Sequence, residues 1–149
     1  EGGVVTGSKV LIDFLRNHAR TFLFQTALPP SICAASCQAL ELIERGREKR
    51  KQLLLKAHKI KTKLQEMGYA VKGGHTPILP VLIGDAKKSV LFSAKLQENG
   101  IYAPAIRPPT VPAGESRIRL TVTADHSVQD IDRLLHAFDL IGKELELIQ

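Results

Sequence analysis

The sequence predicts an α+β fold, in which helices cover one face of a small antiparallel or mixed sheet and a long helical arm precedes it. Three observations predict this arrangement. Apolar residues recur every three or four positions over residues 30–67, short β-type segments follow residue 68, and helical spacing returns twice before residue 149. The chain has 149 residues, of which 44% are hydrophobic, so it is long enough to enclose one core.

Residues 1–29 are expected to be the tail end of a larger domain, formed by a short strand, a helix and a loop. The chain starts without Met, and two glycines lead into a β-prone Val-Val pair. Ser8 is a typical N-cap for a helix to about Ala19. The stripe expected to be buried on that helix is Val10, Leu11, Phe14 and Leu15. Residues 20–30 end in two prolines and are expected to be an extended loop.

Residues 30–68 are expected to form one long connecting helix, which Gly46 can bend. Pro30 suits its first turn, where a missing N–H costs nothing, and Gly68 suits its C-terminal cap. Its first apolar face is formed by Ile32, Ser36, Leu40 and Ile43. Its second is formed by Leu53, Ala57, Ile60, Leu64 and Met67.

The formal net charge is +6, and nine lysines and arginines lie between Arg45 and Lys63. No aromatic residue that could stack on bases is interleaved with them, so no nucleic-acid partner is expected. A solvated helix face is the simplest interpretation. The alternative is a surface that attracts a polyanionic small molecule or an acidic protein, as in a stand-alone interaction module.

Residues 69–149 are expected to form the α+β domain, in the order strand, strand, helix, strand, strand, helix. The predicted strands are 69–72, 77–83, 101–106 and 118–123, with a Gly73-Gly74 turn. The first helix, 85–99, is expected to bury Val90, Leu91, Ala94 and Leu96. The last helix begins with a capping box at Ser127 and Asp130. Its predicted core stripe is Val128, Ile131, Leu134, Leu135, Phe138, Ile141 and Leu145.

Several classes of function are disfavoured. No apolar stretch is long enough to cross a bilayer, and no secretory leader is recognised, so no membrane association is expected. Cys33 and Cys37 lie four residues apart in a helical pattern and are interpreted as small core residues, which favours a cytoplasmic protein. The five histidines show no ligand spacing, so no metal site is expected.

A loop with four prolines, residues 103–114, separates the last two predicted strands and contains Arg107. A rigid loop holds a side chain with little entropy to lose, so the Arg107 guanidinium is a candidate carboxylate or phosphate ligand. A solvated or ion-paired arginine is the alternative. Arg117 and Arg119 alternate with apolar residues along a strand and are interpreted as structural.

The runs 105–114, 117–124 and 130–135 resemble the C-terminal part of the α-oxoamine synthases, which are pyridoxal-phosphate enzymes of fold type I. Gly2-Gly3 and residues 24–30 resemble the stretch that follows that family's cofactor-binding lysine. The resemblance therefore covers nearly the whole chain, and it implies that residues 69–149 are the C-terminal small domain of such a transferase. The run Ile106-Arg-Pro-Pro-Thr-Val-Pro112 looks most like the 8-amino-7-oxononanoate synthases, with glycine C-acetyltransferases and other family members as alternatives.

This resemblance implies a cytoplasmic homodimer in biotin biosynthesis that condenses L-alanine with pimeloyl-CoA or a pimeloyl carrier protein and releases CO2, with pyridoxal 5'-phosphate as cofactor. Arg107 matches the arginine that binds the substrate carboxylate, and Thr110 matches a loop threonine near the substrate. Thr26 matches a residue that reaches the cofactor phosphate of the partner subunit, whereas Gln25 departs from the family's usual Ser or Thr. Since the resemblance places the cofactor-binding lysine upstream of Glu1, this chain alone is expected to be inactive.

Overall fold

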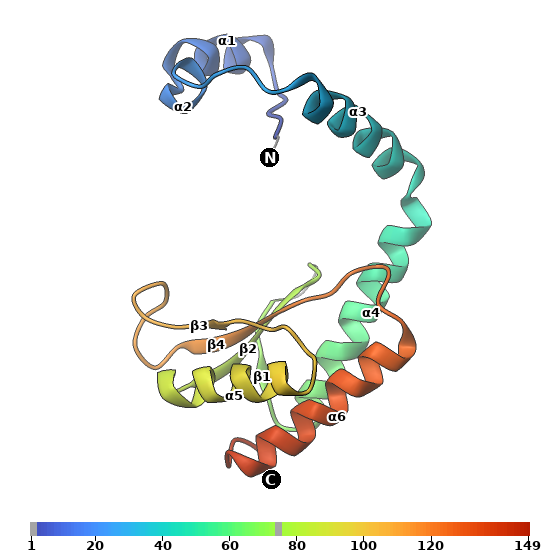
Figure 1. Cartoon of the computed structure of the whole chain (residues 1–149), viewed down its shortest axis with the longest axis vertical. Helices are drawn as coiled ribbons and strands as arrows, with labels where there is room; N and C mark the ends of the chain where they lie inside the picture. Colours follow the sequence, from blue (N-terminus) through green and yellow to red (C-terminus); the bar gives the residue numbers. More distant parts are fainter. Residues whose placement is uncertain (1–2, 74–75) are drawn as a thin grey trace. The chain divides into compact units, whose positions relative to one another are not determined.

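The computed structural model describes residues 3–73 and 76–149. They form two compact units, Glu1–Arg47 and Glu48–Gln149, and each is described by itself. Figure 1 shows the helices and strands of both units. Gly2 of the predicted Gly2-Gly3 match and Gly74 of the predicted turn lie outside the described residues. No helix in the described ranges is both long and apolar enough to cross a membrane.

The first unit contains α1 (Lys9–His18), α2 (Arg20–Leu23) and α3 (Pro30–Arg45). The Ser8 hydroxyl accepts a hydrogen bond from the Leu11 N–H, which confirms the predicted N-cap. Residues 3–8 form no strand, because no other described segment pairs with them, and 20–23 form a helical turn where a loop was expected.

None of the three helices of the first unit buries a side chain. The stripe predicted to be buried on α1 is instead open, with Val10 80% and Phe14 56% exposed. Cys33 and Cys37 are also exposed, so their interpretation as core residues is wrong. Spacing alone identifies an apolar face, but nothing within this unit covers it.

The expected single connecting helix is interrupted at Gly46. There α3 ends, and α4 (Arg47–Glu66) begins with the next residue. Gly46 has φ −83° and ψ 28°, and its N–H donates to the Ile43 carbonyl, as expected for the residue with the highest helix cost after proline.

The second apolar stripe and the C-terminal cap of α4 are as predicted. Its buried residues are Ala57, Ile60 and Leu64. Gly68, at φ +102°, donates to the Gln65 carbonyl while Tyr69 donates to the Leu64 carbonyl, which is the hydrogen-bond pattern of a Schellman motif.

The second unit contains a four-stranded sheet in the order β1-β2-β4-β3, antiparallel at each pairing. Its strands are β1 (Ala70–Val71), β2 (Ile78–Gly84), β3 (Ala105–Ile106) and β4 (Ser116–Thr121). Leu79 pairs with Leu120, and Val81 pairs with Ile118; all four side chains are buried on the same face. Arg117 and Arg119 occupy the other face of β4, as their alternation predicts.

Helices α4, α5 (Ala86–Glu98) and α6 (Val128–Glu144) complete the core over the buried face. Three aromatic rings lie at its centre: Tyr69, Phe92 and Phe138. The Tyr69 hydroxyl donates to the Phe138 carbonyl oxygen at 2.8 Å. These helices and strands follow the predicted order, and the α+β prediction is confirmed.

The predicted stripes of α5 and α6 need correction. On α5, Leu96 is buried as predicted, together with Ser89 and Phe92, whereas Val90 is 48% and Leu91 46% exposed. On α6 the capping box is present and most of the predicted stripe is buried, but Val128 is exposed because it lies in the first turn.

Candidate functional site

Arg107 begins the loop that connects β3 to β4. The Ile106–Arg117 pairing fixes the base of this loop. The Thr110 N–H donates to the Arg107 carbonyl oxygen at 3.0 Å, which closes a turn around Pro108 and Pro109, and the peptide bond between those prolines is cis. The two predicted substrate ligands, Arg107 and Thr110, are therefore held in one turn.

The Arg107 guanidinium is available for a ligand. The side chain is exposed, and its Nη1 makes one weak contact, 3.4 Å to the Pro108 carbonyl oxygen. Among the described residues no carboxylate forms an ion pair with it. Arg117, by contrast, donates from Nε and Nη2 to the carbonyl and carboxylate of Glu115, at 2.9 and 2.7 Å, so it has the structural role that its position predicts.

Arg107 borders an open groove that runs along α5. The α5 residues that line it are Ala86, Lys87, Val90, Leu91 and Ala94. The sequence does not predict this groove, because two apolar stripes of α5 have helical spacing and share Leu96, and the pattern favours burial of the stripe that also contains Val90 and Leu91. The face with Phe92 is buried instead. Phe92 is fully buried, and the neighbouring Ser89 hydroxyl, also buried, donates to the Asp85 carbonyl.

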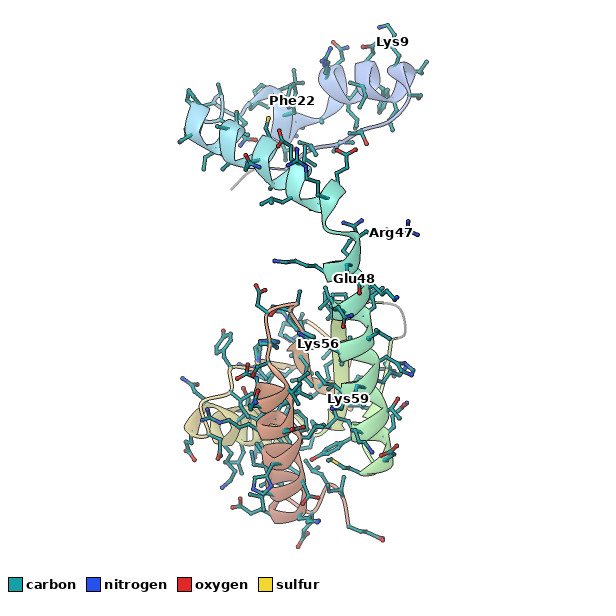
Figure 2. All side chains as sticks on the ribbon, turned by 90° about the vertical axis from the view of Figure 1, so that its right-hand side faces the viewer. Lys9, Phe22, Arg47, Glu48, Lys56 and Lys59 are labelled. Carbon is teal, nitrogen blue, oxygen red and sulfur yellow. The ribbon has the colours of Figure 1, made fainter. Side chains whose placement is uncertain are left out.

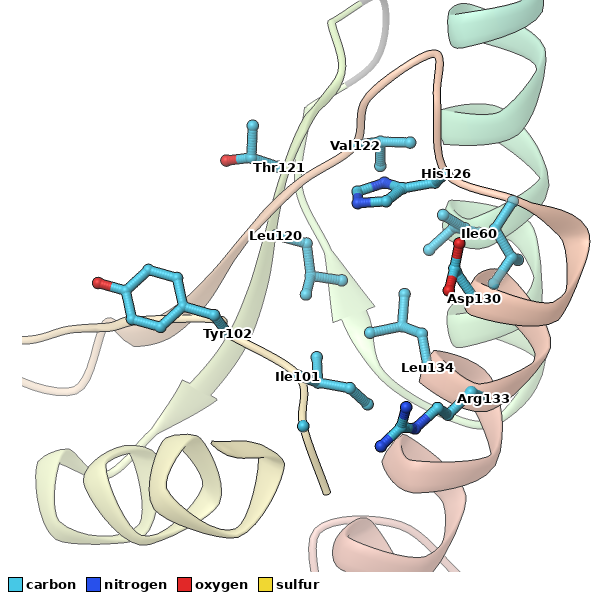
Figure 3. A pocket seen from close by; sticks show the side chains of 12 residues that line it. Ile60, Ile101, Tyr102, Leu120, Thr121, Val122, His126, Asp130, Arg133 and Leu134 are labelled. Atoms are coloured by element: carbon cyan, nitrogen blue, oxygen red, sulfur yellow. The ribbon is translucent and has the colours of Figure 1, made fainter. Parts of the chain in front are cut away.

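A second cavity, of about 260 Å³, lies at the far end of β4, beside Leu120 and Val122 (Figure 3). Three of the polar side chains that line it, those of His126, Asp130 and Arg133, have hydrogen-bond partners within the protein. The His126 Nδ1 accepts from the Thr123 N–H at 3.1 Å, and the Arg133 guanidinium donates to the Asn99 carbonyl. None of the predicted site residues lines this cavity, and its rim groups serve to fix the surrounding loops.

Asp130 and Lys56 hold the loop at this cavity in place. The Asp130 carboxylate accepts from the Ser127 N–H and hydroxyl at 2.8 and 2.7 Å, and these hydrogen bonds lower the pKa of Asp130. The Lys56 ammonium donates to the carbonyl oxygens of Ala124 and His126 at 2.6 and 2.7 Å, joining α4 to the chain before α6.

Three further lysines of α4, Lys59, Lys61 and Lys63, do not converge on a site. Lys61 donates to the Gly73 carbonyl, and Lys63 pairs with Glu66. Lys59 is exposed and projects from the ribbon of α4 (Figure 2). This distribution favours the solvated-face interpretation of the basic segment. Within residues 3–73 and 76–149, no group of three or more potential metal ligands occurs.

Thr26, the predicted phosphate ligand, lies in the first unit, in the irregular segment between α2 and α3. Its side chain is exposed, and in the described part of the chain its hydroxyl has no hydrogen-bond partner. The N–H groups of Thr26, Ala27 and Leu28 likewise have no backbone acceptor there. A hydroxyl and several consecutive free N–H groups are donors suited to a phosphate.

The aminotransferase class I and II family model matches residues 1–138. The chain belongs to this family. Relatives within it include the 8-amino-7-oxononanoate synthase 2 of Bacillus subtilis (strain 168), which is 64% identical over 148 residues, or 99% of this chain. The 8-amino-7-oxononanoate synthase of Lysinibacillus sphaericus is 44% identical over the same share. The chain spans 38% of the length of each of these two relatives.

Solved structures of the family share the fold. Serine palmitoyltransferase from Sphingomonas wittichii is 27% identical, with a TM-score of 0.84 over 93% of this chain and 35% of that one. Another serine palmitoyltransferase, solved with PLP (pyridoxal phosphate), is 26% identical, with a TM-score of 0.84 over 92% of this chain and 35% of its own. The 8-amino-7-oxononanoate synthase of Francisella tularensis is 23% identical, with a TM-score of 0.76 over 94% of this chain and 40% of that one. These likenesses confirm the predicted fold type I small domain.

Proposed function

We propose that this chain is the C-terminal part of an 8-amino-7-oxononanoate synthase. The observation that carries the proposal is the 64% identity, over 99% of the chain, to a protein of that name. The reaction joins the pimeloyl group of a thioester to the α-carbon of L-alanine, releasing CO2 and the thiol of CoA or of a carrier protein. The proposed assembly is a cytoplasmic homodimer.

Arg107 is proposed to bind the carboxylate of L-alanine. A guanidinium can donate two parallel hydrogen bonds to one carboxylate, which fixes the orientation of the amino acid as well as its position. The Thr110 N–H already holds the Arg107 carbonyl, so the turn fixes the backbone from which the guanidinium extends. The exposed Thr110 hydroxyl is proposed to contact the same substrate.

The free donors around Thr26 fit the phosphate of pyridoxal phosphate, which the Thr26 hydroxyl is proposed to hold across the homodimer interface. When bound, this cofactor supplies an electron-accepting ring that stabilises negative charge on the α-carbon of the amino acid. The cofactor-binding lysine is proposed to belong to the part of the relatives that this chain does not span.

The test uses the full-length polypeptide that contains this chain, loaded with pyridoxal phosphate. L-alanine or glycine is combined with pimeloyl-CoA, a pimeloyl carrier protein or acetyl-CoA, and the amino-ketone products are identified by mass spectrometry. The proposal expects 8-amino-7-oxononanoate from L-alanine and a pimeloyl donor. Product from glycine with acetyl-CoA, and from no other combination, would contradict the proposal and would identify a glycine C-acetyltransferase.

A further inference from the structure

The groove along α5 presents an apolar surface where the sequence predicts a buried one. Val90 and Leu91 are about half exposed, and Ala86 and Ala94 line the same groove one turn to either side. This strip extends over about two turns of the helix, roughly 12 Å along its axis. An extended aliphatic chain laid along α5 would remove these side chains from water.

Two cationic side chains border this apolar strip. Arg107 lies on the loop side, and Lys87 lies near the N-terminal end of α5. Lys87 is exposed, and within the described part of the chain its ammonium has no hydrogen-bond or ion-pair partner. A pimeloyl thioester is a linear chain of methylene groups that ends in a carboxylate. Together with L-alanine, it brings two carboxylates to the reaction, which matches two separate cations beside one apolar wall.

We infer that the α5 groove binds the acyl chain of the thioester donor. Val90 and Leu91 contact the methylene groups, and the Lys87 ammonium pairs with the terminal carboxylate, while Arg107 serves the amino acid. The inference rests on the proposed function and deepens it, since it assigns the residues that select a dicarboxylic acyl chain. An acyl chain without a terminal carboxylate could not pair with the Lys87 ammonium, so Lys87 would not strengthen its binding.

Lys87→Gln in the full-length holoenzyme tests the charge pairing. The KM for pimeloyl-CoA is expected to rise about tenfold, because the variant lacks the charge-assisted hydrogen bond, and the KM for L-alanine is expected to stay the same. With octanoyl-CoA, which has no terminal carboxylate, wild type and variant should be equal. Lys59→Gln, which removes an exposed lysine of α4, is the matched control. An unchanged preference for pimeloyl-CoA over octanoyl-CoA in Lys87→Gln would overturn the inference.

Leu91→Ala tests the apolar wall. The KM values for pimeloyl-CoA and octanoyl-CoA are expected to rise together, with the KM for L-alanine and the melting temperature unchanged. A lower melting temperature with unaltered KM values would overturn the inference, because it would show that this face packs against the rest of the polypeptide. If the wild type forms no 8-amino-7-oxononanoate from either pimeloyl-CoA or a pimeloyl carrier protein, the proposed function fails and the inference with it. If the wild type is active and both variants behave as wild type, the groove assignment alone fails.

Discussion

Gly142 allows α6 to lie close to the Tyr69 hydroxyl in the core of the second unit. It is buried on α6, and a Cβ at this position would lie 2.0 Å from the Tyr69 hydroxyl and 2.9 Å from the nearest atom of Ile148. Gly142→Ala therefore forces the Tyr69 ring to move and breaks its 2.8 Å hydrogen bond to the Phe138 carbonyl. Burial, with a contribution from the charge of Asp139, raises the pKa of the Tyr69 phenol, so this donor persists through neutral pH.

The expected cost of Gly142→Ala follows from three terms. Overpacking costs about 1–3 kcal/mol, the lost hydrogen bond about 1 kcal/mol, and the higher helix propensity of alanine returns about 1 kcal/mol. The net loss in unfolding free energy is about 2 kcal/mol, equivalent to a fall in melting temperature of roughly 6 °C for a chain of this size. Urea unfolding measures it, with Gly3→Ala as control, because a Cβ at Gly3 meets no atom within 4 Å.

A double-mutant cycle identifies the atom responsible. Tyr69→Phe removes the hydroxyl oxygen that the new Cβ would strike, so Gly142→Ala should cost about 1 kcal/mol less in the Tyr69→Phe background. Additive effects of the two substitutions, or a Gly142→Ala variant as stable as the wild type, would show that a Cβ at Gly142 does not clash with the Tyr69 hydroxyl.

Three further outcomes are expected. The hydrogen bonds from Ser127 lower the pKa of Asp130, so its carboxylate stabilises the fold above its usual pKa of 3.8. The wild type should therefore be more stable to urea than Asp130→Asn at pH 7 and should lose that advantage as the pH falls through the lowered pKa; a pH-independent difference would argue against the capping box as the cause. Lys56→Met keeps the aliphatic stem but removes the donor to two carbonyl oxygens, so the unfolding free energy measured in urea should fall by about 1–2 kcal/mol. A variant as stable as the wild type would show that water replaces the ammonium. In the full-length protein, Thr26→Ala should retain less pyridoxal phosphate after gel filtration while Thr26→Ser retains it normally, and equal retention by both would contradict the phosphate contact.

Local signals in the sequence are sufficient to predict the elements that depend on local interactions. The Schellman cap at Gly68 and the capping box at Ser127 both form from residues within five positions of each other, so their patterns are readable without the fold. The apolar stripe of α4 is also predicted correctly, because from Lys56 onward every position of the helix outside the stripe is polar or charged.

The sequence is less informative where two faces compete or where the covering element is distant. Val90 and Phe92 both belong to helically spaced apolar sets, and only the position of the sheet decides that Phe92 is buried. The candidate site shows the same limit. The four prolines of its loop indicate Arg107 from the sequence alone. That Arg107 and Lys87 line the same groove is seen only in the fold, because they belong to separate segments of the chain.

The proposed role of Arg107 can be measured directly by titrating L-alanine into the full-length holoenzyme and following the absorbance of the bound cofactor. Because Arg107 has no ion pair in the described chain, Arg107→Ala should leave folding and cofactor content unchanged. Its Kd for L-alanine should rise about 100-fold, as expected for the loss of a two-point charged hydrogen bond, and Arg107→Lys should be intermediate. Arg119→Ala, on the exposed face of β4, is the control. An unchanged Kd in Arg107→Ala would contradict the assignment of Arg107 as the substrate-carboxylate ligand.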